Sequence, residues 1–477
     1  MKSVRHSFQH SSFPYAWFVG PFALLLCVFL AACGASSVVL GGGVGSGGSG
    51  VAEGAVSGFG SVIVDGVTYA DSDATVVMDN AAGTQDVAEV KIGQRVRVRH
   101  QTTGVADEIR VMPQLRGPAS TTQNAGWFQM LGQWVRIETV TDLQTTATIM
   151  EGLTSVTAGM DLEVHGTWTL DTDKNALVLV ASRIEKLASA ADPLWVSGAV
   201  QSRVAGINSL VLAGATPLTI SAPLVDSSIV AGSLVTAWVP ASKWVGASMT
   251  ADRLVDVAAG LAADDRWVVT APVLARDVAR GEITVQGQRI KLPSPLLTNA
   301  PAPGTSVQIE MVRDGAAWKA VSLQERGNPG DLGGTVEIKG ALSLPNDTSS
   351  PLRLRGTSIS LTGLSLDASC ESLKGRDNVF VSLQAARGAP GQPLQASRLS
   401  CSLNVPDNGV IEVQGRLLQF NVSSKTLSMS TLGGTLALSW SDNTWLPAQP
   451  LSLINQVVEV EYQIVNGQNR LRKLKPH

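Results

Sequence analysis

The chain is poor in the residues that most often carry catalysis or bind metals. Its 477 residues include five histidines and four cysteines, and beyond residue 32 the histidines are His100, His165 and His477. None of these three stands at metal-ligand spacing from another, which argues against a zinc site and against a Ser-His-Asp triad. Paired carboxylates stay open, because they need no local motif. We therefore predict no catalytic residue, no bound metal and no cofactor, and we expect a protein that is not an enzyme.

Charged residues are also scarce, and the basic ones do not dominate. Charged side chains make up 16% of the chain, with 36 basic against 39 acidic groups and a net charge of −3. Proteins that bind nucleic acids usually carry a basic surface. The composition therefore predicts no nucleic-acid partner.

Long helix-forming stretches are hard to find in this sequence. Val, Leu, Thr and Ser dominate, and 47 glycines and 22 prolines interrupt the chain often. Residues of this kind are typical of strands and of the turns between them. The length exceeds that of a single typical domain. The composition therefore predicts an all-β protein with several domains.

The long apolar run of the chain lies near its N-terminus. Lys2 and Arg5 precede an uncharged stretch over residues 14–32, and small residues end that stretch. A positive start, an apolar middle and small residues before a cut site are typical of a secretory signal. The length also suits a membrane-spanning helix, but Gly20 and Pro21 interrupt the run. We favour a signal peptide over residues 1–32.

The end of this run, Leu30-Ala31-Ala32-Cys33, resembles the lipobox of bacterial lipoproteins. The resemblance implies that the thiol of Cys33 receives a diacylglyceryl group and that cleavage before Cys33 removes the signal. An ordinary signal peptide ending near Cys33 is the alternative. Gly34, not aspartate, follows the cysteine, which by resemblance to Gram-negative sorting implies the outer membrane. Two or three acyl chains hold a protein stably, because each buried methylene contributes about 0.8 kcal/mol.

Residues 33–50 are interpreted as the lipidated cysteine and a tether. Residues 41–50 read GGGVGSGGSG, and glycine and serine cannot build a core. A segment of this composition is a flexible linker, long enough to separate a folded body from a membrane surface. Both a periplasmic and a surface-facing position of that body stay open.

Beyond residue 50 the chain repeats a short motif: a turn residue, two or three variable residues, then alternating apolar ones. The six copies begin at Gly93, Gly159, Gly232, Gly304, Gly375 and Asn455. A second motif of the Ala-Asp-Glu-Ile type follows each copy, at residues 106–109, 181–184, 251–254, 320–323, 396–399 and 468–471. Asparagine is the residue nearest to glycine at left-handed turn positions. Two motifs in the same order, six times over, predict a tandem repeat.

Each repeat has the pattern of a small β module. Hairpin dipeptides such as Asp65-Gly66 open several repeats. Period-two alternation lets one face of each strand enter a core, and closure into a barrel removes exposed edges. We predict a tandem array of about six OB-like or Greek-key β-barrel modules. Their predicted bounds are 51–115, 116–190, 193–258, 265–327, 334–404 and 408–475.

His100 and His165 follow the same alternating strand in the first two repeats. We expect both side chains near solvent, at the ends of equivalent strands.

Residues 56–67, VSGFGSVIVDGV, together with residues 91–98, KIGQRVRV, resemble a bacterial family of domains of unknown function, number 5666. The resemblance is good over residues 51–112 and partial over 113–258, and only the two repeated motifs carry it further. Members of that family are small β modules, often in tandem on exported lipoproteins. The resemblance therefore implies architecture and compartment. It implies no catalytic residue, because the family has no assigned chemistry.

Two cysteines, Cys370 and Cys401, lie after Cys33. An even pair within one repeat, in an oxidising compartment, favours a disulfide. Two buried free thiols are the alternative. A bond would close a loop of about 31 residues, which the chain-entropy model values at roughly 3.5–4 kcal/mol.

Tryptophan is unusually frequent relative to tyrosine, with 11 against 3. Trp127, Trp134 and Trp168 fall in the second repeat. Such rings fill small barrels in many proteins, whereas exposed rings would instead bind sugars or partner proteins. We take these three as the candidate binding aromatics.

Together these features predict a membrane-anchored envelope lipoprotein whose β modules bind or scaffold other envelope components without catalysis. The expected partners are the membrane, through the lipid anchor, and envelope polysaccharide, peptidoglycan or envelope proteins. A hydrolase of envelope polymers with its site at a repeat junction is one alternative. A purely structural spacer is another.

Overall fold

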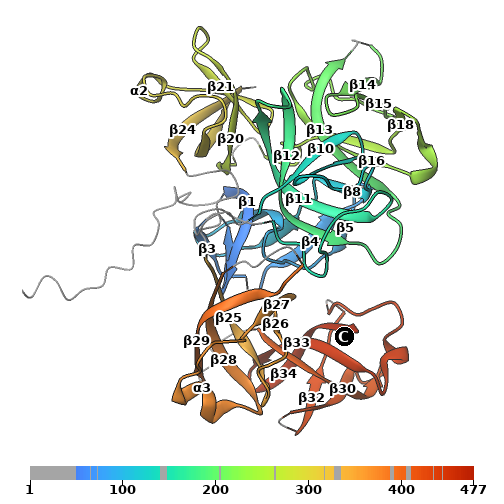
Figure 1. The fold of residues 1–477 in the computed structure, drawn as a ribbon, viewed down its shortest axis with the longest axis vertical. Helices are drawn as coiled ribbons and strands as arrows, with labels where there is room; N and C mark the ends of the chain where they lie inside the picture. Colours follow the sequence, from blue (N-terminus) through green and yellow to red (C-terminus); the bar gives the residue numbers. More distant parts are fainter. Residues whose placement is uncertain are drawn as a thin grey trace, which may run out of the picture. The chain divides into compact units, whose positions relative to one another are not determined.

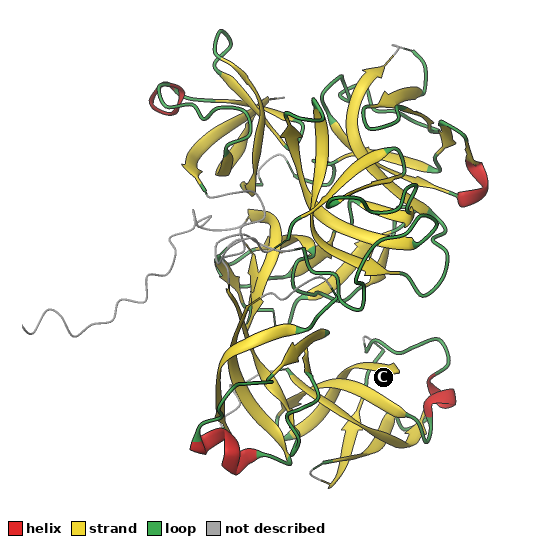
Figure 2. Cartoon of the chain, viewed as in Figure 1, coloured by secondary structure: helices red, strands yellow, loops and turns green. Residues whose placement is uncertain are grey.

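The computed structural model describes residues 50–64, 66–71, 73–139, 148–203, 206–262, 265–315, 317–326, 335–386, 391–403, 410–432, 434–442 and 444–476. The predicted signal peptide, Cys33 and residues 33–49 of the tether lie outside these residues. Strands dominate the described part (Figure 2), and the all-β class is confirmed. Its helices are short: α2 (Ser294–Leu297), α3 (Ala368–Leu373), η1 (Ala241–Lys243) and η2 (Pro450–Leu453). No helix among the described residues has the length and apolar character needed to cross a bilayer.

One pattern of strand pairing recurs along the chain, and residues 267–325 show it completely. The strands there are β20 (Trp267–Asp277), β21 (Glu282–Val285), β22 (Gln288–Lys291), β23 (Ser306–Asp314) and β24 (Ala317–Glu325). β20, β21 and β22 form an antiparallel meander, and β22 runs parallel to β24. β24 pairs with β23, and β23 returns to β20, both antiparallel. The five pairings therefore form a closed cycle.

We call each such group a module and number the modules along the chain. Module 1 holds β1 (Gly50–Phe59), β2 (Val62–Val64), β3 (Val67–Tyr69), β4 (Thr75–Asp79), β5 (Gln85–Val87), β6 (Arg95–His100) and β7 (Glu108–Val111). Module 2 holds β8 (Leu115–Pro118), β9 (Trp127–Met130), β10 (Gln133–Ile137), β11 (Asp161–Asp171) and β12 (Ala176–Lys186). Module 3 holds β13 (Leu194–Arg203), β14 (Ser209–Leu212), β15 (Leu218–Ser221), β16 (Leu234–Val239), β17 (Trp244–Val245), β18 (Ser248–Thr250) and β19 (Arg253–Asp256).

Module 4 is the group β20–β24 described above. Module 5 holds β25 (Thr335–Leu344), β26 (Leu352–Leu354), β27 (Thr357–Ser360), β28 (Arg376–Ala386) and β29 (Leu394–Ser402). Module 6 holds β30 (Ile411–Asn421), β31 (Thr426–Thr431), β32 (Gly434–Ser439), β33 (Val457–Val465) and β34 (Gln468–Pro476). Module 6 repeats the closed cycle of module 4 in full. Modules 1, 2 and 5 share its antiparallel pairing of the opening strand with the penultimate one and its parallel pairing onto the last strand. Module 3 differs, because β13 pairs antiparallel with β16, β15 runs parallel to β18, and the last strand, β19, pairs with β16.

The repeated turn residue has the same structural role in every module. Gly93, Gly159, Gly232, Gly304, Gly375 and Asn455 all have φ between 68° and 90°. Their backbone N–H groups donate to carbonyls of or next to the opening strand, of Val56, Ala119, Val200, Val273, Leu344 and Leu417, over 2.7–2.9 Å. Only glycine and, less readily, asparagine adopt this left-handed conformation without strain. The motif read from the sequence is therefore a turn that holds the strand after it against the first strand of the module.

The modules are not separate units on a string, because their opening strands pair across module boundaries. β1 runs parallel to β20 of module 4 and to β25 of module 5, and β25 runs parallel to β30 of module 6 (Figure 1). β8 of module 2 pairs with β13 of module 3. The hydrophobic cores follow the same grouping: modules 2 and 3 share one core, and so do modules 1 and 5. Modules 4 and 6 each supply most of a core of their own.

The second face of β6 is covered by protein, not by water. Val96 and Val98 point into the core of the module, as alternation predicts, and Arg95 and Arg97 point away from it. Both arginines are nevertheless buried, and they bind the two carboxylate oxygens of buried Glu53 over 2.9 and 3.0 Å. Although burial would raise it, the charges of Arg97 and Arg95 hold the pKa of Glu53 below its usual range. This triad is a charged centre inside the protein.

Charged contacts of module 1 reach all the other modules. Lys91 binds Glu185 of module 2. Arg97 donates to the carbonyls of Val257 and Ala259, which follow module 3, and Arg99 binds Asp265, which precedes module 4. Asp71 binds Arg355 of module 5, and Glu89 binds Lys473 of module 6. The backbone N–H of Val51 donates to the carbonyl of Arg266 at the start of module 4, over 2.7 Å. Module 1 is therefore the part of the described chain to which the others are attached.

The expectation for the two histidines is wrong. His100 is 1% exposed and His165 is fully buried. His165 accepts a hydrogen bond from the backbone N–H of Arg95 through Nδ1, and its Nε2 lies 2.9 Å from Glu163. The polar face of the equivalent strand in module 2 thus packs against module 1. Alternation correctly separated two faces of each strand but gave no indication of what covers the second one.

We predict that Glu53→Gln destabilises the whole assembly. The change leaves two buried guanidinium groups without their counter-charge, which costs roughly 3–5 kcal/mol. Urea unfolding of the full chain measures the loss. Asp442→Asn is the matched control, because Asp442 has a side chain 85% exposed and pairs with Lys425 at the surface, where such pairs contribute about 0–1 kcal/mol. Equal effects of the two changes would contradict the assignment.

Candidate functional site

The three candidate binding tryptophans do not share one surface. Trp168 on β11 is 2% exposed, and its indole N–H donates to Oε1 of Gln114 over 2.9 Å. It belongs to the core that modules 2 and 3 share. In this structure the Trp168 ring therefore offers no face to a ligand.

Trp127 and Trp134 lie together on the β9–β10 hairpin and are half-buried. Their rings meet edge to face at 6.1 Å. The ammonium group of Lys174 lies 4.4 Å from the centre of the Trp134 ring and 5.0 Å from that of Trp127. Because a cation already occupies this aromatic pair, the two rings are a partly covered surface rather than an open platform. Their role in binding stays a prediction.

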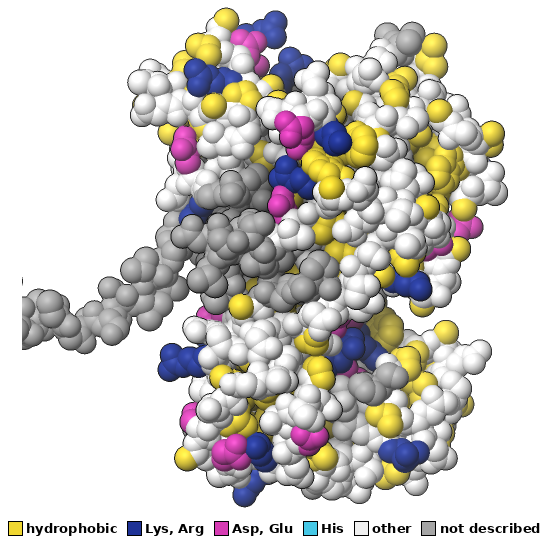
Figure 3. Space-filling view, viewed as in Figure 1, with side chains coloured by type: hydrophobic (Ala, Val, Ile, Leu, Met, Phe, Trp, Pro, Cys, Tyr) yellow, Lys and Arg dark blue, Asp and Glu magenta, His cyan; other side chains and the backbone are white. Residues whose placement is uncertain are grey.

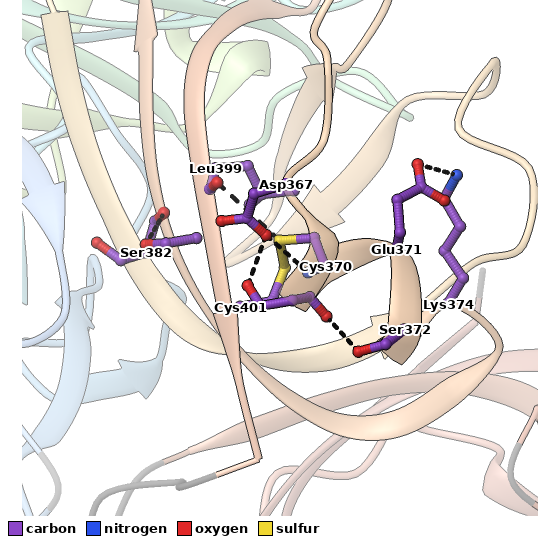
Figure 4. Close-up of a disulfide and its surroundings, with 10 residues drawn as sticks. Asp367, Cys370, Glu371, Ser372, Lys374, Ser382, Leu399 and Cys401 are labelled. Carbon is purple, nitrogen blue, oxygen red and sulfur yellow. Dashed lines mark hydrogen bonds and ion pairs between the residues drawn. A yellow bond between two sulfur atoms is a disulfide. The ribbon is translucent and has the colours of Figure 1, made fainter.

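Cys370 and Cys401 form a disulfide that ties α3 to β29 (Figure 4). Asp367 caps the helix by accepting the backbone N–H of Cys370 over 2.8 Å. The two cysteines are 31 residues apart in the sequence, so the bond closes a loop whose constraint is worth roughly 3.5–4 kcal/mol in the chain-entropy model. It holds the edge of module 5 and takes no part in the cavity described next.

A cavity of about 730 Å³ lies where module 3 meets module 4. The β21–β22 hairpin of module 4 forms one wall, and β19 of module 3 forms another. The hairpin turn packs so closely on module 3 that a Cβ at Gly287 would lie 2.2 Å from the backbone nitrogen of Leu234. Gly287 also has φ of 69°, so glycine is needed there on both counts. This close approach holds the β21–β22 hairpin of module 4 against module 3.

Asp256, at the end of β19, is the carboxylate in this cavity with the most specific surroundings. Its Oδ1 accepts the backbone N–H of Ala258 over 2.7 Å and the side chain of Gln288 over 2.8 Å. Burial raises the pKa of Asp256 above its usual range, although these hydrogen bonds and the charge of Arg313 oppose the shift. A carboxyl group with a raised pKa in a cavity is a common feature of binding and catalytic sites.

Arg253, Arg313 and Trp318 also line the cavity. The guanidinium of Arg313 lies 4.0 Å from the centre of the Trp318 ring. Burial lowers the pKa of Arg313, and the charge of Asp256 opposes this shift. Arg253 lies against the Trp238 ring at 4.6 Å and donates to the carbonyl of Asn80 in module 1. The cavity therefore offers a carboxyl acceptor and flat cationic surfaces to one ligand.

The sequence contained part of this site without marking it as one. Arg253 belongs to the repeated Ala-Asp-Arg-Leu motif, and Asp256 follows three residues later. The hairpin signal at Val285-Gln286-Gly287 was visible too. No spacing rule relates the two segments, because the pairing of separate modules decides whether they meet.

A second group of buried carboxyls lies in module 6, next to modules 1 and 5. Glu412 and Glu459 are each 3% exposed. Burial and the charges of Glu459 and Glu461 raise the pKa of Glu412 well above its usual range. Glu459 is also 2.7 Å from the ammonium of Lys475, which helps keep the pKa of Glu459 low although burial opposes this. Both carboxyl groups are closed to solvent.

Two carboxyl groups with separated pKa values are the arrangement that acid–base hydrolysis needs. A substrate, however, cannot reach side chains with 3% exposure without opening the module. We therefore interpret Glu412 and Glu459 as a structural pair.

Among the described residues there is no group of three or more His, Cys, Asp or Glu side chains placed to hold a metal ion. The chain matches no protein-family model and no curated protein sequence. The cavity of modules 3 and 4 is therefore assessed on its own geometry.

We predict that ionisation of Glu412 lowers the free energy of unfolding as the pH rises, and that Glu412→Gln removes this contribution to the pH dependence. With a raised pKa the folded state keeps a proton that the unfolded state loses near pH 4.5, so stability declines as pH rises until it passes the folded pKa of Glu412. The gap in unfolding free energy between variant and wild type should widen by up to about 1.4 kcal/mol per pH unit in that window. Urea unfolding from pH 5 to pH 8 measures it.

Glu371→Gln is the control for this series, because Glu371 is exposed and pairs with Lys374 at the surface. Its gap should stay constant with pH. A constant gap for Glu412→Gln as well would show that Glu412 is ionised in the folded protein.

Proposed function

We propose that this chain is a lipid-anchored, non-catalytic binding protein of the bacterial cell envelope, held in the outer membrane through acylated Cys33. Leu30-Ala31-Ala32-Cys33 and the Gly/Ser tether support the anchor and the compartment. The resemblance to family 5666 supports the same compartment and a tandem of OB-like barrels. The closed cycle of strand pairings in modules 4 and 6 agrees with that architecture.

The observation that carries the binding function is the cavity of about 730 Å³ between modules 3 and 4. Its volume falls within the roughly 300–1,000 Å³ of small-molecule sites. It also combines a carboxyl group of raised pKa, Asp256, with the Arg313–Trp318 stack. A structural spacer has no need of such a cavity. We take its ligand to be a component of the envelope, which the anchored protein would meet at high local concentration.

A hydrolase is the second candidate, and Glu412 with Glu459 is the observation that favours it. We place it second because both side chains are buried.

The anchor is tested by metabolic labelling with a fatty acid. The full precursor should yield a labelled, membrane-bound protein, and Cys33→Ser should lose the label and the membrane fraction together. A labelled Cys33→Ser protein, or an unlabelled wild type that still carries residues 1–32, would contradict lipidation at Cys33.

The binding function is tested by filling the cavity. Ala317 is an exposed residue of its wall, so Ala317→Trp should obstruct it whatever the ligand is. We expect at least a tenfold loss in retention of the detergent-solubilised chain on isolated envelope polymers. Ala437→Trp, on exposed β32 of module 6, is the matched control and should bind as wild type does. No retention of the wild type, or equal retention of both variants, would contradict the proposal.

A further inference from the structure

The charged groups of this cavity that lack a partner indicate which ligand it takes. Arg289 and Lys291 lie in its wall on β22, and both are exposed. Neither forms a hydrogen bond or an ion pair with any other described residue. Glu282 of β21 lies opposite Lys291 of β22 in the strand pairing. The positive charge of Lys291 therefore has a carboxylate near it, and that of Arg289 has none opposite it. Lys291 is also opposite Lys319 of β24, which adds positive potential at this edge.

The acidic groups of the wall are mostly engaged. Asp252 pairs with Lys243 over 2.6 Å, and Asp226 accepts from Ser228. Asp256 uses Oδ1 for Ala258 and Gln288. Within the described chain, no residue donates a hydrogen bond to Oδ2 of Asp256. A half-buried acceptor of this kind needs a donor from a ligand or from water.

The groups of the wall without a partner among the described residues, Arg289, Lys291 and Oδ2 of Asp256, need two kinds of ligand group at once. Anionic groups would satisfy Arg289 and Lys291, and the flat guanidinium of Arg313 suits a planar carboxylate. Hydroxyl donors would satisfy Asp256. A polyphosphate carries no hydroxyl donors between its charges, so it would leave Asp256 without a donor. Carboxylated sugars have both required groups on each unit.

Peptides are a weaker fit to this wall. β22, which carries both free cations, pairs with β21 on one side and with β24 on the other. It therefore has no free edge to which a peptide could add as a strand. Side-chain groups, not backbone groups, must recognise the ligand here.

We infer that the cavity between modules 3 and 4 binds a short carboxylated oligosaccharide, with the sugar hydroxyls on Asp256 and the carboxylates on Arg289, Lys291 and Arg313. This inference rests on the proposed binding function and names its ligand class. The volume of about 730 Å³ suits the end of a glycan or a short segment of it. Acidic polysaccharide and the lactyl-bearing sugar of peptidoglycan share this chemistry.

Calorimetric titration of the detergent-solubilised full chain tests the ligand class directly. The probes are tetragalacturonate, a GlcNAc–MurNAc disaccharide, neutral chitotetraose and a pentaglutamate peptide. We expect binding of tetragalacturonate or of the disaccharide at least tenfold tighter than that of chitotetraose and of the peptide. Whichever acidic sugar binds better identifies the source of the ligand.

Substitutions in the cavity wall test which residues contact the sugar. Arg289→Ala/Lys291→Ala should weaken binding of the acidic sugar at least tenfold and reduce its salt dependence. Asp256→Asn should weaken it about fivefold or more while the chain stays folded by circular dichroism. Arg376→Ala/Arg398→Ala is the matched control, because both arginines are exposed in module 5 and have no hydrogen bond or ion pair with other described residues; it should bind as wild type does.

The outcomes separate this inference from the proposed function. Tighter binding of chitotetraose or pentaglutamate, with loss of binding in Ala317→Trp, would leave a binding protein and overturn the carboxylated sugar. Acidic-sugar binding that survives Arg289→Ala/Lys291→Ala unchanged would place the ligand elsewhere and overturn the assigned site. Failure of every probe, together with no retention on envelope polymers, would remove the proposed function itself.

Discussion

The buried triad of Glu53, Arg95 and Arg97 constrains the rest of the molecule. Charges of this kind are expensive to remove from water unless each finds a partner. Arg95 and Arg97 share Glu53, and Arg97 completes its bonds on carbonyls that follow β19 in module 3. The guanidinium of Arg97 in module 1 therefore has all these hydrogen bonds only when module 3 lies against it. The same applies to Arg183, which donates to the carbonyl of Ile92 in module 1 and pairs with Glu185 beside it.

This arrangement explains how a chain with so few charged residues is held together. Side chains with charge are distributed thinly over the face seen in Figure 3, with no large patch of one sign. Others are buried where modules meet: Glu53, Arg95, Arg97, Arg183, Glu412 and Glu459. Two carboxylates in these contacts, Glu89 and Glu185, are half-buried groups whose pKa values neighbouring lysine and arginine charges hold at about 2. Because their folded pKa values are depressed, their contribution is present at neutral pH and is lost as pH falls from about 5 towards 2.

Much of the module could be predicted from the sequence, and little of the assembly. The turn glycines, the substitution by Asn455 and the alternation of Val96 and Val98 all follow from local rules of backbone geometry and burial. What covers the opposite face of each strand depends on contacts between segments far apart in the sequence. His165 and Trp168 show the consequence: one was expected near solvent and the other was a candidate surface ring, yet both are buried. The cavity at Asp256 escaped prediction for the same reason, because its walls come from two modules. Lipidation of Cys33 stays a prediction from the lipobox alone.

Amide hydrogen exchange tests most directly whether the modules form one assembly built on module 1. The N–H of Val51 donates to Arg266 at the start of module 4, and the N–H of Arg95 donates to His165 of module 2. The N–H of Gly93, bonded to Val56 within module 1, is the internal reference. If the modules are joined as described, Val51 and Arg95 should exchange as slowly as Gly93. Exchange of Val51 and Arg95 at the rate of exposed amides, with Gly93 still protected, would show independent modules and contradict the account.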